Sequence, residues 1–461
     1  MLDQNIIAQL VQIVEKGGVL QTPEDLAVYS YDGTFEEHRP EVVVLPQTTL
    51  QVSQVVSLAG RERIPVVTRG MGSGLAAASV PFCGGITLAM TRMNHLLEID
   101  QQNAIAHVEA GMVTADLQAE VEKRGLFYPP DPSSNRHSTI GGNIACNAGG
   151  PRCLKYGVTG DYVMGLTVVL ADGRVLRTGG KVIKDVVGYD LTGLFTGSEG
   201  TLCIITEALL KLVARPKFVR TALVDFNSID DACRTVNAIL TAGILPATLE
   251  LMDETAIACI EEAMHLGLPL DVGAVLLIET DGSDEAAVLH EIEGAAKICG
   301  EFGARRVKIA KDEAERASLW KARRSVSPSL ARKAPNKLGE DITVPRNAIP
   351  EAVHRLKEIS AKYGLPIVIF GHAGDGNLHP NILFDKRDPE QWRKVEQMVA
   401  EEFNTSLELG GTLSGEHGVG ALKRPYMLHA LGPDSIDMQQ RIKQAFDPLN
   451  ILNPGKVLPQ S

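Results

Sequence analysis

The chain has 461 residues, 44% of them hydrophobic and 22% charged, which is the composition of a soluble globular protein with more than one hydrophobic core. The net charge of −12 argues against a nucleic-acid-binding face, and no apolar run of about 18 residues predicts a transmembrane helix. The seven cysteines are scattered without a C-x-x-C pair, which argues against a disulfide framework and an internal iron–sulfur cluster. A cytoplasmic protein is therefore expected, with peripheral attachment to the inner face of the membrane left open.

The first 216 residues predict one domain in which strands alternate with helices before glycine-rich loops take over. The N-terminal segment predicts an amphipathic helix, and Thr22 followed by Pro23 predicts the start of a second one. Further helices are expected at 48–63 and at 114–125, the latter closed by Gly125. Strands are expected in five apolar segments, at 41–46, 65–70, 84–90, 103–113 and, as a hairpin turning at Asp172-Gly173, 166–179.

Pro216 is the expected end of this domain, because the pattern restarts after it. Residues 217–410 predict a mixed α+β domain with antiparallel strands, and residues 411–461 a C-terminal segment. The expected elements of the second domain are strands at 220–226, 247–253 and 272–282, and helices at 228–243, from Glu285 and after residue 385.

Three glycine-rich loops lie in the first domain, at 65–79, 128–157 and 193–207. The first has the spacing G-x-G-x-G, and no acidic residue follows at the distance that a dinucleotide-binding Rossmann unit requires. Taken alone, this loop is also compatible with a tight connection between two elements. Such loops offer many backbone N–H groups to an anion with little side-chain bulk, so three of them predict a diphosphate ligand.

Two polar clusters stand out later in the chain, GHAGDGNLHPNILF at 371–384 and SGEHGVG at 414–420. His372, His379 and Glu416 offer a mixed nitrogen and oxygen set that suits Zn²⁺, with Mn²⁺ or Fe²⁺ as alternatives. Their spacing does not fit H-E-x-x-H, and polar loops without a metal remain the alternative. His417 diverges from its neighbour and is a candidate general base.

The loop motifs TRGMGSGL, PPDPSS, TIGGN, NAGG, KYG and LFTGSEGTLCI together resemble the flavin domain of the vanillyl-alcohol-oxidase/PCMH superfamily. GHAGDGNLHP, SGEHGVG and the terminal LNPGK resemble the branch of that superfamily that holds the flavin subunit of glycolate oxidase, D-lactate dehydrogenase and D-2-hydroxyglutarate dehydrogenase. The resemblance covers nearly the whole chain. It implies an α+β fold, with a PCMH-type FAD-binding domain of two α+β subdomains, an α+β substrate domain with an antiparallel sheet, and a C-terminal helical segment that returns to the flavin.

The resemblance also implies non-covalent FAD and its contacts, residue by residue. His137 and Cys146 are the nearest candidates for the covalent link found elsewhere in the superfamily, but this branch generally lacks the link. The pyrophosphate loop would comprise Arg69, Gly70, Met71, Gly72, Ser73 (where a Thr is usual), Gly74 and Leu75. The flavin ring and diphosphate would be approached by Pro130, Asp131, Ser134, Thr139, Gly141, Gly142, Asn143, Gly150, Tyr156 and Gly157. The adenine side would meet Glu199, Gly200 and Ile204, and the isoalloxazine would meet Asn453.

For the chemistry, the resemblance implies oxidation of a D-2-hydroxy acid, with His417 as base, a metal at His372, His379 and Glu416, and hydride passing from C2 to flavin N5. Arg323, Ser327, Asn377 and His372 would bind the substrate. One departure favours D-lactate or glycolate over a diacid, because Gly339 stands where D-2-hydroxyglutarate enzymes often have a lysine.

The absence of an internal cluster implies an external electron acceptor: an iron–sulfur subunit, an electron-transfer flavoprotein, a quinone or a cytochrome. A homodimer stays open. Two rival functions remain at this point. One is a zinc hydrolase, which leaves the glycine loops unexplained, and the other is a flavin-binding subunit of a larger oxidase with little activity of its own.

Overall fold

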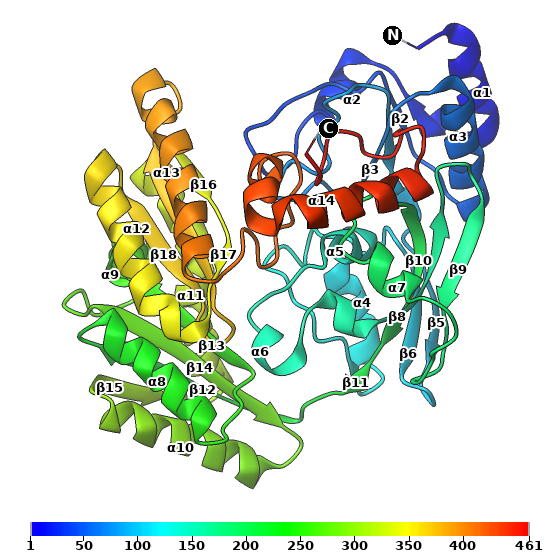
Figure 1. The fold of residues 1–461 in the computed structure, drawn as a ribbon. Helices are drawn as coiled ribbons and strands as arrows, with labels where there is room; N and C mark the ends of the chain where they lie inside the picture. The colour runs from blue at the N-terminus through cyan, green and yellow to red at the C-terminus, as the bar shows by residue number, and fades with distance from the viewer. Residues whose placement is uncertain (1, 460–461) are drawn as a thin grey trace. The chain divides into compact units, whose positions relative to one another are not determined.

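The structure is a computed structural model that describes residues 2–459 and divides into two compact units (Figure 1). The first unit comprises the chain up to Gly150, then Gly157–Arg215, and the chain from Glu416 onward. The second comprises Pro151–Tyr156 and Pro216–Gly415. The C-terminal segment, expected to start at 411, thus packs with the first unit from Glu416.

The first unit begins with a four-stranded sheet in the order β1-β2-β4-β3. Strands β2 and β3 both pair with β4 in parallel, and α3 makes the crossover between them, as the predicted strand–helix–strand unit requires. Thr22 caps α2 by accepting the N–H of Asp25. The elements are α1 (Gln4–Val14), β1 (Val19–Leu20), α2 (Pro23–Val28), β2 (Val42–Val44), α3 (Thr49–Glu62), β3 (Val66–Arg69) and β4 (Ile86–Ala89).

A second, antiparallel sheet of the first unit has the order β5-β6-β10-β8-β9. The predicted hairpin at Asp172-Gly173 joins β8 to β9, and β5 was not predicted. The elements are β5 (Leu96–Asp100), β6 (Ile105–Glu109), α4 (Thr114–Glu122), β7 (Leu126–Phe127), α5 (Ile140–Cys146), β8 (Val163–Val169), β9 (Val175–Gly179), α7 (Leu191–Phe195), β10 (Ile204–Lys211) and β11 (Val213–Ala214).

The C-terminal chain completes the first unit. Helix α14 (Met427–Phe446), red in Figure 1, leads to a segment that bridges β3 in parallel, with the N–H of Val66 donating to Ile451 and that of Asn453 donating to Val66. Ile451 and Leu452 join the apolar cluster that α1 and α3 form against the first sheet. The resemblance implied a return of this segment to the flavin, and the structure places the segment in the unit that carries the glycine loops at 65–79 and 193–207.

The second unit is built on one antiparallel sheet in the order β15-β12-β14-β13-β18-β19-β16, with β17 also paired to β19. The predicted antiparallel α+β fold is confirmed. Its strands are β12 (Phe218–Phe226), β13 (Thr248–Asp253), β14 (Ala274–Gly282), β15 (Ala304–Ile309), β16 (Asn336–Gly339), β17 (Ile342–Thr343), β18 (Ile367–His372) and β19 (Asn377–Phe384).

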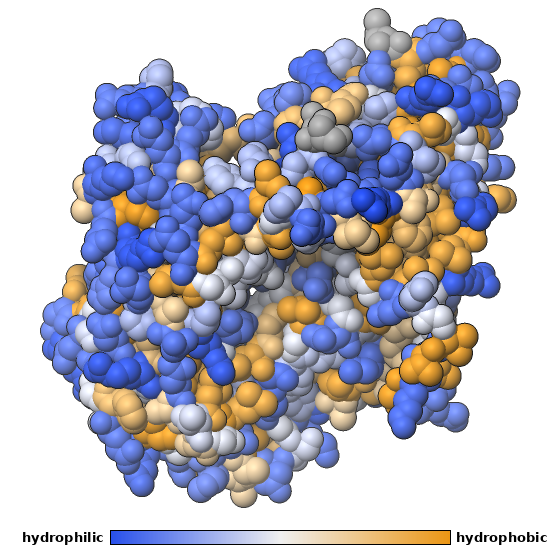
Figure 2. All heavy atoms as spheres, in the orientation of Figure 1, coloured by the Kyte–Doolittle hydropathy of each residue, from blue (hydrophilic) through white to orange (hydrophobic). Residues whose placement is uncertain are grey.

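Helices cover both faces of this sheet. Helices α9 and α11 pack on one face around Met252, Leu277 and Phe370, and the other four cover the opposite face. The outward surfaces of α12 and α13 are mostly hydrophilic in Figure 2, as amphipathic helices require. The helices on the two faces are α8 (Ile229–Thr241), α9 (Glu254–Met264), α10 (Glu285–Glu301), α11 (Glu313–Lys333), α12 (Ile349–Tyr363) and α13 (Pro389–Glu408), and the short helix α6 (Cys153–Tyr156) also belongs to this unit. No helix in residues 2–459 has the length and apolarity needed to cross a membrane.

Candidate active site

Strand register brings the polar residues of the second unit into one row across the sheet. Glu250 on β13 pairs with His372 on β18, which pairs with Asn377 on β19. In the next row, Phe370 pairs with His379. Paired residues of an antiparallel sheet project to the same face, so these side chains all lie on the face that α9 and α11 cover.

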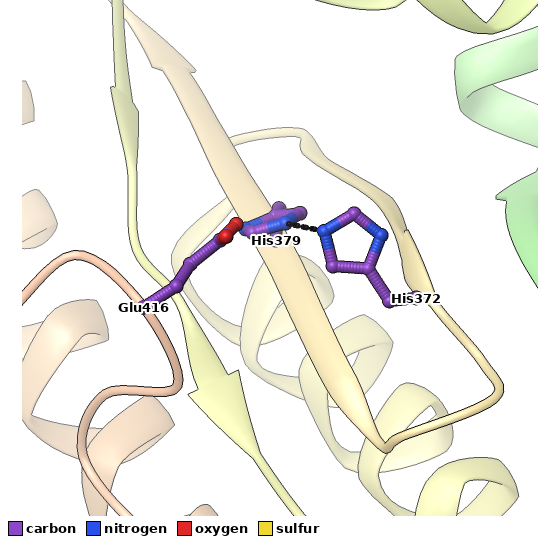
Figure 3. Close-up of side chains that lie close together, drawn as sticks. All are labelled: His372, His379 and Glu416. Atoms are coloured by element: carbon purple, nitrogen blue, oxygen red, sulfur yellow. Dashed lines mark hydrogen bonds between the residues drawn. The ribbon is translucent and has the colours of Figure 1, made fainter. Parts of the chain in front are cut away.

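Both histidines are buried, and their rings meet edge to face, with an angle of 87° between the ring planes. Their Nε2 atoms are 3.4 Å apart, and Glu416 offers a carboxylate oxygen so that all three ligand atoms lie within 4.8 Å of one another (Figure 3). Two nitrogens bound at about 2.0–2.1 Å to one tetrahedral Zn²⁺ lie about 3.3 Å apart. The nitrogen separation and the donor set therefore fit a divalent ion.

The backbone that leads to Glu416 is held by the second unit. Asp341, fully buried, accepts the N–H of Gly415 at 2.8 Å and the hydroxyl of Ser414 at 3.0 Å. A methyl group on Gly415 would lie 1.7 Å from Nδ2 of Asn377, so only glycine fits this approach. The first glycine of SGEHGVG, Gly415, is thus required by the packing, and it directly precedes Glu416.

The sequence analysis did not single out Glu250, although a carboxylate in the middle of the predicted core strand TLELMD can itself indicate a functional residue. Its side chain is fully buried and accepts from Nδ1 of His372 and from Nε of Arg323. Burial alone raises the pKa of Glu250, but the positive charge of Arg323 and the bond to His372 hold that pKa below its usual value. Glu250 is therefore a carboxylate at neutral pH.

Arg323 and Ser327 lie one turn apart on α11. The Arg323 guanidinium also sits over the Phe370 ring, 4.8 Å from its centroid. The Ser327 hydroxyl accepts a hydrogen bond from Nζ of Lys337, a cation that the sequence analysis did not consider. Burial lowers the pKa of Lys337. Asn377 is buried, and its Oδ1 has no hydrogen-bond donor within the described part of the chain.

The first glycine loop closes tightly in the first unit. Arg69 ends β3, is buried, and donates to the backbone oxygen of Tyr31. A methyl group on Gly70 would lie 2.3 Å from Oγ1 of Thr139, and one on Gly72, at φ +72°, would overlap the Arg69 guanidinium. Glycine is therefore the residue that fits at these two positions, as it does where a backbone turn is closely packed. Met71 and Leu75 are exposed, while Ser73 and Gly74 are partly exposed.

The second glycine loop docks on the first through Thr139. This residue caps α5 by accepting the N–H of Gly142, and Asn143 on the same helix donates to Thr114 at 2.7 Å. Other candidate residues lie around this loop. Pro130 accepts from Gln118, Asp131 approaches Gly150, Ser134 bonds to the backbone of 137 and 138, Gly141 packs on Ala110, and Gly157 packs on Asp161. Tyr156 belongs instead to the second unit, where its hydroxyl donates to Asp281 at 2.7 Å.

The third loop meets the C-terminal segment. The buried carboxylate of Glu199 accepts the N–H groups of Val419 and Gly420, and Nδ2 of Asn453 donates to the backbone oxygen of Glu199 at 2.7 Å. Lys456 of LNPGK lies nearby, and burial lowers its pKa to about 8. Gly200 takes a φ of +71°, and Ile204 packs in the core of the unit. The loop and the C-terminal segment thus form one buried polar cluster.

Three candidate residues remain: His417, His137 and Cys146. His417 follows Glu416 and is half-buried, whereas His137 is exposed. Burial raises the pKa of Cys146, and the nearby negative charge of Glu199 adds to the effect.

Comparison with known proteins identifies two family models along the chain. Residues 40–179 match a FAD binding domain, and residues 215–457 match the C-terminal domain of FAD linked oxidases. Among similar proteins, glycolate oxidase subunit GlcD of Bacillus subtilis is 47% identical over 99% of this chain and 97% of the relative. D-lactate dehydrogenase of Anaerostipes hadrus is 35% identical over 95% of this chain and 92% of the relative.

Solved structures agree at the level of the fold. p-Cresol methylhydroxylase with substrate bound superimposes with a TM-score of 0.83 at 18% identity, over 98% of this chain and 96% of that one. An alkyldihydroxyacetonephosphate synthase gives a TM-score of 0.78 at 19% identity, over 99% and 86%. The chain therefore belongs to the FAD-linked oxidases of the vanillyl-alcohol-oxidase/PCMH superfamily and is a FAD-dependent oxidoreductase.

Proposed function

We propose that the chain oxidises a small D-2-hydroxy acid, with D-lactate or glycolate favoured, to the 2-oxo acid. The observation that carries the proposal is that the two histidines and Arg323, a side chain able to bind a carboxylate, are linked by one buried carboxylate, Glu250. His372 faces His379, and the Glu250 carboxylate that holds His372 also holds Arg323. A 2-hydroxy acid presents a carboxylate and a hydroxyl on adjacent carbons, which is the ligand such a pair suits. Relatives named glycolate oxidase subunit and D-lactate dehydrogenase support the substrate class.

Each residue has a defined task in this proposal. Arg323 binds the substrate carboxylate through its terminal nitrogens, and Ser327 and Asn377 add hydrogen bonds. His417 takes the hydroxyl proton as general base. His372, His379 and Glu416 hold a divalent ion, with Zn²⁺ favoured over Mn²⁺ or Fe²⁺, which supplies a Lewis acid for the hydroxyl. Bound FAD supplies the acceptor for the two electrons that leave C2 as hydride. The FAD contacts are those assigned above to the three glycine loops and Asn453.

Electrons leave to an acceptor outside this chain, because no cysteine set in the described residues forms a cluster site. The candidates are an iron–sulfur subunit, an electron-transfer flavoprotein, a quinone or a cytochrome. The word "subunit" in the name of the Bacillus subtilis relative favours partner chains. It also favours the second candidate function, a flavin-binding subunit of a glycolate oxidase complex with little activity alone. We further propose a cytoplasmic location, at most peripheral to the membrane.

D-2-Hydroxyglutarate is the alternative substrate, and one observation favours it. Lys337 lies two residues before Gly339 on β16, so both project from the same face of the strand. Its Nζ reaches the hydroxyl of Ser327, one turn along α11 from Arg323. Lys337 could therefore bind the second carboxylate of a diacid, although position 339 carries a glycine and not a lysine.

Replacement of His417 tests the proposed mechanism. In anaerobic mixing with D-lactate, His417→Ala should reduce its flavin about 10²–10⁴-fold more slowly than the parent, since a positioned base contributes that much. Its FAD content should be unchanged. His429→Ala, at an exposed histidine of α14, is the control and should match the parent. Flavin reduction at the parental rate in His417→Ala would refute the assignment of the base.

A further inference from the structure

Glu250 is a carboxylate in the middle of a strand that is otherwise buried core. Strand β13 runs through the centre of the sheet, and Glu250 is 0% exposed. A buried charge is costly unless it is paired and hydrogen-bonded. Here each carboxylate oxygen has its own partner, Oε1 with Nδ1 of His372 and Oε2 with Nε of Arg323 at 2.5 Å. The two partners are the ones that the proposed function needs most.

The first bond fixes the tautomer of His372. An ionised carboxylate only accepts hydrogen bonds, so Nδ1 of His372 must carry the hydrogen. In the neutral ring the lone pair is then on Nε2, which faces Nε2 of His379 at 3.4 Å. Carboxylates that bond the far nitrogen of a ligating histidine set its ring orientation and raise its basicity.

The second bond fixes the direction of Arg323. Glu250 engages the guanidinium at Nε, on its inner edge, so the two terminal nitrogens form the outer edge that a substrate carboxylate can meet. The ring of Phe370, paired with His379 across the strands, supports the guanidinium from its face. The arginine is thus held by an anion and by a ring from the same sheet.

We propose that Glu250 is a positioning residue shared by the ion site and by the substrate-binding arginine. It touches neither the substrate nor the ion, but it holds His372 in the ligating tautomer and Arg323 in the carboxylate-binding orientation. The substrate half of this inference rests on the proposed function. The consequence is specific: loss of one carboxylate should weaken ion binding and substrate binding together, while FAD, held by the first unit, stays bound.

A purely structural ion pair would behave differently, and the neighbouring strand offers the matched control. Glu279 on β14 is 2% exposed and also meets an arginine of α11, Arg316. Its other partners are the hydroxyl of Thr221 and the indole N–H of Trp320, each at 2.6 Å. Glu279 therefore matches Glu250 in burial, sheet and helix partner, but it contacts neither His372 nor Arg323.

The experiment compares Glu250→Gln with Glu279→Gln in the FAD-loaded enzyme after a chelator has removed bound metal. Titration with Zn²⁺ should show affinity about 10–100-fold lower in Glu250→Gln than in the parent, which is the usual effect of losing such a partner. KM for D-lactate should rise in the Zn²⁺-reconstituted Glu250→Gln enzyme, and FAD content should not change. Glu279→Gln should keep the parental Zn²⁺ affinity and KM. Parental Zn²⁺ affinity and KM in Glu250→Gln would overturn the inference.

A second measurement on the parent protein keeps the inference testable if Glu250→Gln does not fold. With ¹⁵N-labelled histidine, the ring nitrogens of His372, assigned by difference from His372→Gln, should report hydrogen on Nδ1 and none on Nε2 in the metal-free protein. Hydrogen on Nε2 would overturn the inference. Failure of the proposed function can be told apart from failure of this inference. If no 2-hydroxy acid reduces the flavin of the parent protein, the proposed function is refuted. The Zn²⁺ affinity and the tautomer of His372 then still decide the role of Glu250.

Discussion

Replacing Arg323 by methionine should damage both stability and substrate binding. Arg323→Met keeps most of the side-chain length but removes the charge that faces the fully buried Glu250 carboxylate. Removing one partner of a buried pair costs about 3–5 kcal/mol, because the other charge stays buried. For a unit of this size, roughly 2–4 °C of melting temperature is lost per kcal/mol, so the second unit should melt about 6–20 °C lower.

Arg316→Met is the control for the stability effect. Arg316 lies about two turns earlier on α11 and meets Glu279, but its side chain is 27% exposed. Glu279 also keeps the donors of Thr221 and Trp320 after the change. The expected cost is therefore about 1 kcal/mol or less, as for exposed ion pairs. Differential scanning calorimetry of the two variants beside the parent measures the difference.

The effect of Arg323→Met on catalysis should appear in KM. Hydrogen bonds to charged groups contribute about 1.5–3 kcal/mol, so KM for D-lactate should rise about 10- to 150-fold. Arg316→Met should leave KM unchanged. Equal losses of melting temperature in the two variants would refute the argument that burial makes the Arg323 pair more important for stability than the Arg316 pair. A parental KM in Arg323→Met would refute the assignment of Arg323 to substrate binding.

Three further predictions concern the ion, the pH dependence and the flavin loop. His379→Gln should purify with FAD but without a divalent ion by elemental analysis, since it removes one ligand of three; a full ion content would contradict the assignment. Burial raises the pKa of Asp253 to about 7, so its stabilising contribution is present below about pH 4 and is lost as the pH rises to 7. Asp253→Asn should therefore gain stability over the parent, on the order of 2–4 kcal/mol in urea unfolding, at pH 8 but not at pH 4, and equal effects at both would contradict this. Gly70→Ala should lose FAD, because its methyl would lie 2.3 Å from Oγ1 of Thr139, whereas Gly180→Ala, where no atom lies within 4 Å, should retain it.

Much of the fold could be predicted because periodicity and caps are local. Thr22 and Pro23 begin α2, and Asp172-Gly173 turns the β8–β9 hairpin, as their residue types require. Helix α11 was not predicted as an element, because its many charged residues and its internal Pro328 hide the apolar stripe that packs on the sheet. Tertiary packing, not local preference, decides that segment.

The residues of the site, too, could be predicted from the sequence only in part. The two histidines and Glu416 could be singled out from residue type and resemblance, but their approach depends on the register of β18 with β19 and on the bond from Gly415 to Asp341. Glu250 could not be linked to them, because 122 residues separate it from His372 and only the pairing of β13 with β18 brings them together. Lys337 could not be predicted, because its bond to Ser327 depends on the packing of β16 beside α11.

The central claim is that this flavoprotein oxidises D-2-hydroxy acids, and anaerobic mixing tests it directly. The purified protein is mixed with D-lactate, L-lactate, glycolate and D-2-hydroxyglutarate in turn, and the absorbance of oxidised flavin is followed. We predict rapid bleaching by D-lactate or glycolate, none by L-lactate, and loss of the reaction after chelator treatment. A yellow protein that none of these acids bleaches would contradict the proposed function.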